Sequence, residues 1–192
     1  MTQIAHDDLM QLPVLSYTGP IHLVRQNGEL EPAMAALQHE QVVGFDTETP
    51  PSFRKGHIHN PTLVQLAGSQ AVYLIQLRHL DSTAALAALL SDKHVVKTGV
   101  AVGRDLIDLQ RLFPFQPAGI LDLGDVAKRQ GIKQTGVRNL AGMLLGGRIT
   151  KGARTSNWAA AQLSTSQLRY AATDAWVCRQ LYLHFEKQGW LK

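Results

Sequence analysis

The order of β-rich and helical segments is the feature that most restricts how this chain can fold. Residues 62–67 and 71–76 are β-rich runs separated only by Gly68, Ser69 and Gln70, which predicts an antiparallel hairpin. Helix, strand, helix and strand follow, and this order predicts parallel pairing because parallel strands need a crossover connection. We therefore expect an α/β fold in which helices flank one mixed β-sheet.

The expected elements account for most of the chain. The expected strands cover residues 21–24, 41–48, 62–67, 71–76, 95–99 and 119–123, and the expected helices cover residues 30–39, 82–90, 102–113, 137–145 and 166–187. The chain has 192 residues, 45% hydrophobic and 18% charged, which suits a single globular domain. It has no secretory start and no apolar run that could span a membrane. Its one cysteine, Cys178, is expected to be a small core residue. We expect a cytoplasmic protein with no membrane contact and no obligate protein partner.

Two carboxylates, Asp46 and Glu48, stand at the end of the apolar run at 41–45. Side chains alternate between the two faces of a strand, so these two acids point the same way. Like charges at that separation repel each other unless a cation lies between them or water solvates both. On its own, the pair is compatible with a solvated strand end or with a cation site.

Two further acids interrupt apolar helix faces. Asp105 falls inside the apolar stripe of the expected helix at 102–113. Asp174 lies on the apolar face of the helix at 166–187, and Tyr170 precedes it by one turn on that face. Burying an unpaired carboxylate is costly, so the inward-facing acids need one shared explanation. Four such carboxylates suit Mg²⁺ or Mn²⁺, and two ions of this kind are the usual device for displacement at phosphorus.

Positive charge is concentrated in one segment. No acidic residue lies between Asp125 and Asp174, whereas eight of the 19 basic residues fall in that interval. The rest of the chain carries 11 basic and all 15 acidic residues. Such a segment is compatible with a solvated surface or with a track for a phosphate backbone. If it is a track, Lys151 and Arg154 are the expected phosphate contacts.

Three stretches resemble, in order and spacing, the motifs of the DEDD 3′–5′ exonucleases. They are VVGFDTET, VKTGVAVGRDLIDLQRLF and LSTSQLRYAATDAWVCRQLY, and the tyrosine four residues before the last aspartate is typical of the DEDDy subclass. The segments SNWAAAQLSTSQLRYAATDA and PTLVQLAGSQAVYLI are similar to those of ribonuclease D and the Werner-syndrome exonuclease domain. The resemblance covers about residues 20–188.

The resemblance implies a ribonuclease H-like fold and a role for each matching residue. Asp46, Glu48 and Asp174 would hold a divalent cation, Mg²⁺ or Mn²⁺, that activates water. Asp46 would also bridge to a second cation, which Asp105 would assist through water. Tyr170 would orient the attacking water with Glu48, because a phenol with a pKa of about 10 is a poor base but a good hydrogen-bonding group. The implied activity is hydrolysis of DNA or RNA from a free 3′ end, with release of nucleoside 5′-monophosphates.

Several expectations concern the surroundings of these motifs. Trp158 in the SNW segment either stacks on a base of the substrate or anchors a loop against the core. His57 and His59, in the loop at 50–60, are expected to be surface residues rather than metal ligands. Because the chain stops soon after the last motif, we expect a single exonuclease domain over residues 1–192, without an accessory helical or helicase domain.

Two other functions stay open. A catalytically silent nucleic-acid-binding module of the same fold would keep the basic segment, but the presence of all four acids and Tyr170 disfavours it. A dinucleotide-binding domain is suggested by TGVAVGRD, which lacks the pattern G-x-G-x-x-G. A nuclease assay with and without divalent metal separates the three functions.

Overall fold

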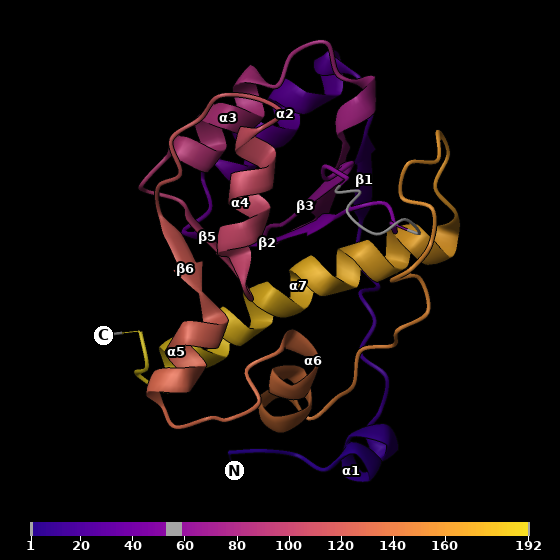
Figure 1. The fold of residues 1–192 in the computed structure, drawn as a ribbon. Coiled ribbons are helices and arrows are strands. Elements are labelled where there is room, and N and C mark those ends of the chain that lie inside the picture. The colour runs from indigo at the N-terminus through magenta and orange to yellow at the C-terminus, as the bar shows by residue number, and fades with distance from the viewer. Residues whose placement is uncertain (1, 53–58, 192) are drawn as a thin grey trace.

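One six-stranded mixed sheet forms the centre of the computed structural model, which describes residues 2–52 and 59–191 (Figure 1). The strands lie side by side in the order β1 (Ile21–Val24), β4 (Val72–Gln76), β3 (Leu63–Ala67), β2 (Val42–Glu48), β5 (Val96–Gly99) and β6 (Ile120–Asp122). Strand β3 is antiparallel to β2 and β4, and the other neighbouring pairs are parallel. The predicted hairpin and the predicted mixed sheet are therefore confirmed.

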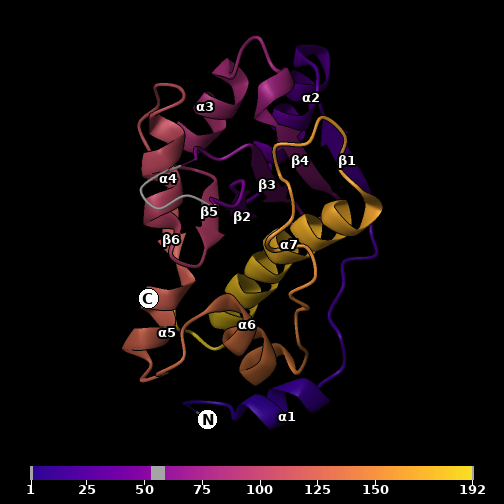
Figure 2. The same ribbon diagram turned by 45° about the vertical axis from the view of Figure 1, so that its right-hand side comes forward.

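Helices cover both faces of this sheet (Figures 1 and 2). Three helices lie together on one face: α2 (Asn27–Leu37), α3 (Ala84–Ser91) and α4 (Val102–Gln110). They form one apolar core with Phe45 of β2 and Leu66 of β3, which are almost completely buried. Because side chains alternate along a strand, β2 turns Phe45 towards these helices and Asp46 towards the opposite face.

The opposite face of the sheet is covered by the long helix α7 (Thr165–Lys187). Helix α7 comes very close to β2, since a Cβ atom added to Gly44 would lie 1.9 Å from the carbonyl oxygen of Ala175. Only glycine fits at this strand position. The close approach brings Asp174, which precedes Ala175, to the same face of β2 as Asp46.

A second apolar cluster surrounds the C-terminal half of α7. It contains buried side chains of α5 (Leu123–Arg129), of α6 (Val137–Leu140) and of the π-helical turn that follows α6 (Ala141–Leu145). Figure 1 shows α5 and α6 gathered beside this half of α7. Cys178 belongs to this cluster and is buried, as expected.

Most elements lie where the sequence predicts them, with differences at their ends. Helix α2 begins three residues earlier than expected, because Gln26 and Glu29 form a capping box. The last strand ends at Asp122, whose side chain accepts a hydrogen bond from the backbone N–H of Gly124 at 2.8 Å. This cap starts α5, a helix that the sequence analysis did not predict. The helix expected at 137–145 is divided into α6 and the π-helical turn.

The N-terminal segment, residues 2–20, also holds a helix that was not predicted, α1 (His6–Gln11). The segment is bound to the domain by backbone hydrogen bonds. The N–H of Leu15 donates to the carbonyl of Arg148 at 2.9 Å, and the N–H of Tyr17 donates to the hydroxyl of Thr173 at 3.0 Å. In Figure 2 the segment runs from beside α6 along α7 to the sheet.

Two expectations concern the exterior of the molecule. Across the described ranges, no helix combines the length and the apolar character needed to cross a bilayer. The side chain of His59 is exposed, whereas His57 lies outside the described residues.

Candidate active site

Four of the five predicted catalytic residues line one cavity of about 590 Å³. Strand β2 supplies Asp46 and Glu48 on the face that α7 covers, and α7 supplies Tyr170 and Asp174 from successive turns. The hydroxyl of Tyr170 donates a hydrogen bond to the carboxylate of Asp174. Elements more than a hundred residues apart in the sequence thus form one wall with three carboxyl groups and a phenol.

Burial raises the pKa of all three carboxyl groups, and repulsion by acidic neighbours raises the pKa of Asp46 and Glu48 further. Burial, followed by the charges of Asp46, Asp174 and Asp105, raises the pKa of Glu48 to about 10. Burial raises the pKa of Asp174 to about 7, although the hydrogen bond from Tyr170 favours its ionised form. The pKa of Asp46 lies well above its usual value, first because of burial and then because of its acidic neighbours. The metal-free cluster therefore retains protons that a bound cation would displace.

The phenol of Tyr170 is held in its protonated form. Its burial and the nearby charges of Asp174 and Glu48 raise its pKa above the ordinary value of 10.0. Across neutral pH the group is therefore a hydrogen-bond donor and not a base, which agrees with the positioning role that the resemblance implies.

The fifth predicted residue, Asp105, lies on the other side of β2. The backbone N–H of Val102 donates to the Asp122 carboxylate at 3.1 Å, which fixes the start of α4 and so the position of Asp105. The Asp105 carboxylate accepts a hydrogen bond from the hydroxyl of Thr47, whose side chain alternates with that of Asp46. Asp105 is not among the described residues that line the cavity, although its charge raises the pKa of Asp46.

The chemistry of these side chains fits a hard divalent cation, because carboxylate oxygens are the ligands that Mg²⁺ and Mn²⁺ prefer. Within the described residues, however, no group of three or more His, Cys, Asp or Glu side chains is arranged so that it could hold a metal ion. Two of the carboxylates contact hydroxyl groups instead, Asp105 that of Thr47 and Asp174 that of Tyr170. Metal binding would require these two side chains to turn towards a common centre.

Both predicted phosphate contacts, Lys151 and Arg154, line the same cavity. They belong to the irregular segment between the π-helical turn and α7, and their side chains are exposed. The charge of Arg154 favours the ionised form of Glu48, so this guanidinium lies within electrostatic reach of the carboxyl groups. The basic side chains thus form a wall next to the acidic one.

The residues of this cavity that were not predicted from the sequence include His6 of α1, and Arg138 and Asn139 of α6. Arg138 belongs to the predicted basic segment, but no local pattern distinguishes it from the other basic residues there. His6 lies before the first motif of the resemblance. Its presence depends on how residues 2–20 cross the domain, which no short-range pattern encodes.

The structure corrects the expectation that Trp158 binds substrate by stacking. Its side chain is 0% exposed and packs in the apolar cluster beneath α7. The Trp158 carbonyl accepts a hydrogen bond from the hydroxyl of Thr62 at 2.8 Å, and its ring lies against that of Tyr170 with centroids 6.1 Å apart. Burial of this large ring stabilises the loop that carries Arg154, which is the anchoring role left open above.

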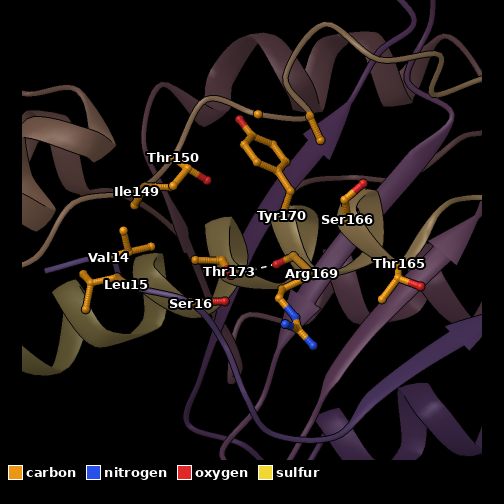
Figure 3. A pocket seen from close by; sticks show the side chains of 12 residues that line it. Val14, Leu15, Ser16, Ile149, Thr150, Thr165, Ser166, Arg169, Tyr170 and Thr173 are labelled. Atoms are coloured by element: carbon orange, nitrogen blue, oxygen red, sulfur yellow. Dashed lines mark hydrogen bonds between the residues drawn. The ribbon is translucent and has the colours of Figure 1, made fainter.

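A second cavity, of about 530 Å³, adjoins the first at Tyr170 (Figure 3). One side is formed by residues of the N-terminal segment, among them Leu15 and Ser16, and the other by Arg169 and Thr173 of α7. The hydroxyl of Thr173 is already bonded to the carbonyl of Arg169 at 2.7 Å. None of the three carboxylates lines this cavity in the described part of the chain, so the acidic cluster belongs to the first cavity.

The family model described as 3′–5′ exonuclease matches residues 21–190. Ribonuclease D of Gluconacetobacter diazotrophicus is 35% identical over 164 residues, which cover 83% of this chain and 41% of that protein. The bifunctional 3′–5′ exonuclease/ATP-dependent helicase WRN of Mus musculus is 30% identical over 181 residues, which cover 89% of this chain and 13% of that protein. The chain thus spans less than half the length of these two relatives.

The fold has a close counterpart among solved structures. The crystal structure of the Aedes aegypti Nibbler EXO domain superimposes with a TM-score of 0.82 and 26% sequence identity, covering 91% of this chain and 92% of that one. The predicted ribonuclease H-like arrangement of the sheet and helices is thereby confirmed. Because the family model matches residues 21–190, a range that contains all three motifs, the chain belongs to the 3′–5′ exonuclease family.

Proposed function

We propose that the chain hydrolyses phosphodiester bonds at the 3′ end of DNA or RNA and releases nucleoside 5′-monophosphates, using two divalent cations, Mg²⁺ or Mn²⁺. One observation carries the proposal: Asp46, Glu48, Tyr170 and Asp174 line one cavity in a chain of the exonuclease family. The relatives named ribonuclease D and WRN exonuclease support a nucleic-acid substrate.

The acidic wall would hold the cations. Asp46, Glu48 and Asp174 are the ligands we propose, with Asp105 assisting from the other side of β2 once it releases the hydroxyl of Thr47. When bound, the cations lower the pKa of water and neutralise the departing 3′ oxygen. The hydroxyl of Tyr170 is proposed to hold the attacking water in line with the phosphorus, together with Glu48.

The basic wall would hold the substrate. Lys151 and Arg154 line the cavity and their side chains are exposed, so their positive charges are available to successive phosphates of the backbone. Their contacts give affinity but no base selectivity, because phosphates carry no sequence information. The choice between DNA and RNA is therefore left to contacts with the sugar and bases.

The test uses 5′-labelled single-stranded DNA and RNA incubated with the protein in Mg²⁺, in Mn²⁺ or in EDTA. We expect a ladder that shortens from the 3′ end in the presence of metal, no ladder in EDTA, and no ladder with the Asp46→Asn variant. Binding of the labelled strands without any shortening would favour the catalytically silent module instead. Cleavage at internal positions would contradict the exonuclease assignment.

A metal-binding measurement makes the test independent of activity. Thermal unfolding followed with and without Mn²⁺ should show a higher Tm with metal for the wild-type protein, because a ligand that binds only the folded state stabilises it. The shift should shrink in Asp46→Asn, whereas Asp125→Asn, a change at an exposed acid of α5, should keep it.

A further inference from the structure

Arg138 differs from the other cations of the catalytic cavity by being partly buried and tethered. It comes from α6, and its Nε donates a hydrogen bond to the carbonyl of Ile149 at 3.1 Å. Lys151 and Arg154, by contrast, have exposed side chains. A guanidinium that is already fixed by one of its N–H groups loses less conformational entropy when the others bind an anion.

Among the described residues, no carboxylate forms an ion pair with the remaining N–H groups of Arg138. In the described part of the chain, no ion pair involves this residue, although it lines the same cavity as Asp46, Glu48 and Asp174. Its positive charge acts on Asp174 from a distance and favours the ionised form of that carboxyl group. A partly buried guanidinium without an ion pair is a ready site for an anion supplied by a ligand.

We propose that Arg138 binds the anionic phosphate of the 3′-terminal linkage of the substrate. Through this contact Arg138 selects a charged linkage for the position next to the carboxylates. The proposal rests on the function proposed above, because only a bond held in this cavity meets both the acidic wall and Tyr170. The planar guanidinium can offer two N–H groups to the two non-bridging oxygens of a phosphodiester. Asn139, the next residue of α6, lines the same cavity and adds an uncharged side-chain amide.

Two other roles must be separated from this one. Arg138 could act only through its bond to Ile149, by fixing the segment that carries Lys151 and Arg154. It could also act only as a counter-charge to Asp174. In both cases substitution would weaken substrate binding by the same factor, whichever linkage of the substrate carries a charge.

The experiment therefore combines variants of Arg138 with neutral linkages in the substrate. Single-stranded oligonucleotides carry one methylphosphonate, which replaces a charged non-bridging oxygen by a methyl group, at the 3′-terminal linkage or five linkages further in. Their Kd is measured by fluorescence anisotropy in EDTA, and a denaturing gel checks that each strand stays intact. The proteins are wild type, Arg138→Met, Arg138→Lys and the control Arg129→Met, which removes an exposed charge of α5 outside the cavity.

With the ordinary oligonucleotide, Arg138→Met should weaken binding by about 10- to 100-fold, the range for a charge-assisted hydrogen bond. With the neutral terminal linkage the same variant should lose less than about twofold, since the contact is already missing. Arg138→Lys should lose less than Arg138→Met with the ordinary strand, and Arg129→Met should behave as wild type with both strands. An equal loss on the charged and the neutral terminal linkage overturns the proposal.

The wild-type protein alone supplies a further check, which holds even if Arg138→Met does not fold. Neutralising the terminal linkage must cost more affinity than neutralising the inner one, and an equal cost overturns the proposal. The outcome is also separate from that of the proposed function, because the Kd is measured without metal or hydrolysis. A missing 3′ ladder in Mg²⁺ would reject the nuclease activity, whereas equal linkage effects reject only the role of Arg138.

Discussion

The two walls of the proposed catalytic cavity are built in opposite ways. The acidic wall consists of Asp46, Glu48 and Asp174, side chains of a central strand and a long helix, of which Glu48 and Asp174 are buried and Asp46 is half-buried. The basic wall consists of Lys151 and Arg154 from an irregular segment, together with Arg138 and His6 from short helices. Most of these side chains are exposed. Regular elements thus fix the groups proposed for chemistry, and loops present the groups proposed for binding.

The difference has an energetic consequence. Buried like charges raise one another's pKa and weaken folding unless a cation or protons neutralise them. Exposed cations on loops stay solvated, so they cost the folded state little and add little to its stability. Substitutions in the acidic wall should therefore change activity and stability in opposite directions, whereas substitutions in the basic wall should change mainly substrate affinity.

The largest effect is expected for Asp46→Asn. This variant removes a proposed ligand of both cations, and we expect nuclease activity to fall by about three orders of magnitude or more. Folding should persist, because the change also removes a buried repelling charge, so the Tm in EDTA should stay equal or rise. A gel-based rate measurement and thermal unfolding test both points, with Asp125→Asn as the control. A nuclease rate close to that of the wild type would contradict the proposed metal site.

The next largest effect is expected for Tyr170→Phe. The phenol is proposed to position water rather than to transfer a proton, so its loss should lower kcat by about 10- to 100-fold, less than the loss of a metal ligand. The KM for substrate should change little. Steady-state rates at saturating Mg²⁺ measure the two constants separately. If Tyr170→Phe is as damaging as Asp46→Asn, the tyrosine does more than orient water.

These two predictions concern the acidic side of the cavity, whose residues were predicted from the sequence. Asp46 and Glu48 share a face because strands have a period of two, and Tyr170 and Asp174 share a face because helices return after one turn. Such periodicity also predicted that Asp105 faces inward. It could not predict that α4 lies on the other face of the sheet, where Asp105 is bonded to Thr47.

Only part of the basic wall was predicted from the sequence, because the positions of its residues depend on how distant segments pack. Lys151 and Arg154 stood out by charge, but the places of Arg138 and His6 depend on the path of loops and of residues 2–20. Trp158 shows the same limit, since its burial is decided by contacts with α7 and not by its neighbours in sequence. Helix α5 was missed because its start depends on the cap supplied by Asp122.

An intermediate effect, confined to affinity, is expected in the basic wall. The double variant Lys151→Ala with Arg154→Ala should raise KM by about tenfold and lower kcat less, because two phosphate contacts are lost. The slope of log Kd against log salt should flatten by roughly one to two units, as expected for two fewer released counterions. Metal affinity should not change.

The matched control for that variant is Lys128→Ala with Arg129→Ala, which removes the same charge from the exposed side of α5. Binding is best compared in the Asp46→Asn background at several salt concentrations, so that hydrolysis does not interfere. Equal salt slopes for the two double variants would show that the basic segment attracts nucleic acid only through its total charge. Lys151 and Arg154 would then not contact phosphates.

A smaller effect is expected in the pH dependence of stability. Folding raises the pKa of Asp174 from its usual 3.8 to about 7, and that of Glu48 from 4.5 to about 10. Between the lower and the upper value of each group the folded protein binds more protons than the unfolded chain, so this part of the stability falls as pH rises. The Tm of the metal-free protein should therefore decrease between about pH 5 and pH 8.

The variant Asp174→Asn isolates one contribution to that decrease. It cannot ionise, so its Tm should fall less steeply over the same range and exceed that of wild type near pH 8, by on the order of 5 °C. Differential scanning fluorimetry in EDTA measures both curves, and Asp125→Asn should keep the wild-type slope. Parallel curves for wild type and Asp174→Asn would mean that this carboxyl group is not protonated on folding.

The smallest effect is expected beneath the acidic wall, at Gln65. This residue lies on β3 directly opposite Asp46, its side chain is 0% exposed, and neither atom of its amide group has a hydrogen-bond partner among the described residues. An unsatisfied buried amide costs about 1 to 3 kcal/mol, so Gln65→Met, which keeps the length of the side chain, should raise the free energy of unfolding.

A gain of about 1 kcal/mol corresponds to a rise in Tm of roughly 2 to 4 °C for a domain of this size. The control is Gln167→Met, because Gln167 is also buried but donates to the carbonyl of Asn157 at 3.2 Å and accepts from the N–H of Ser164 at 2.9 Å. That variant should lower the Tm. If Gln65→Met lowers the Tm as well, a buried water satisfies the Gln65 amide. The polar group of β3 next to Asp46 is then hydrogen-bonded and does not destabilise the fold. The sign of the change in Tm for Gln65→Met therefore distinguishes two cases. In the metal-free protein, the destabilisation either comes from the carboxyl groups of the acidic wall alone or includes an unsatisfied Gln65 amide on β3.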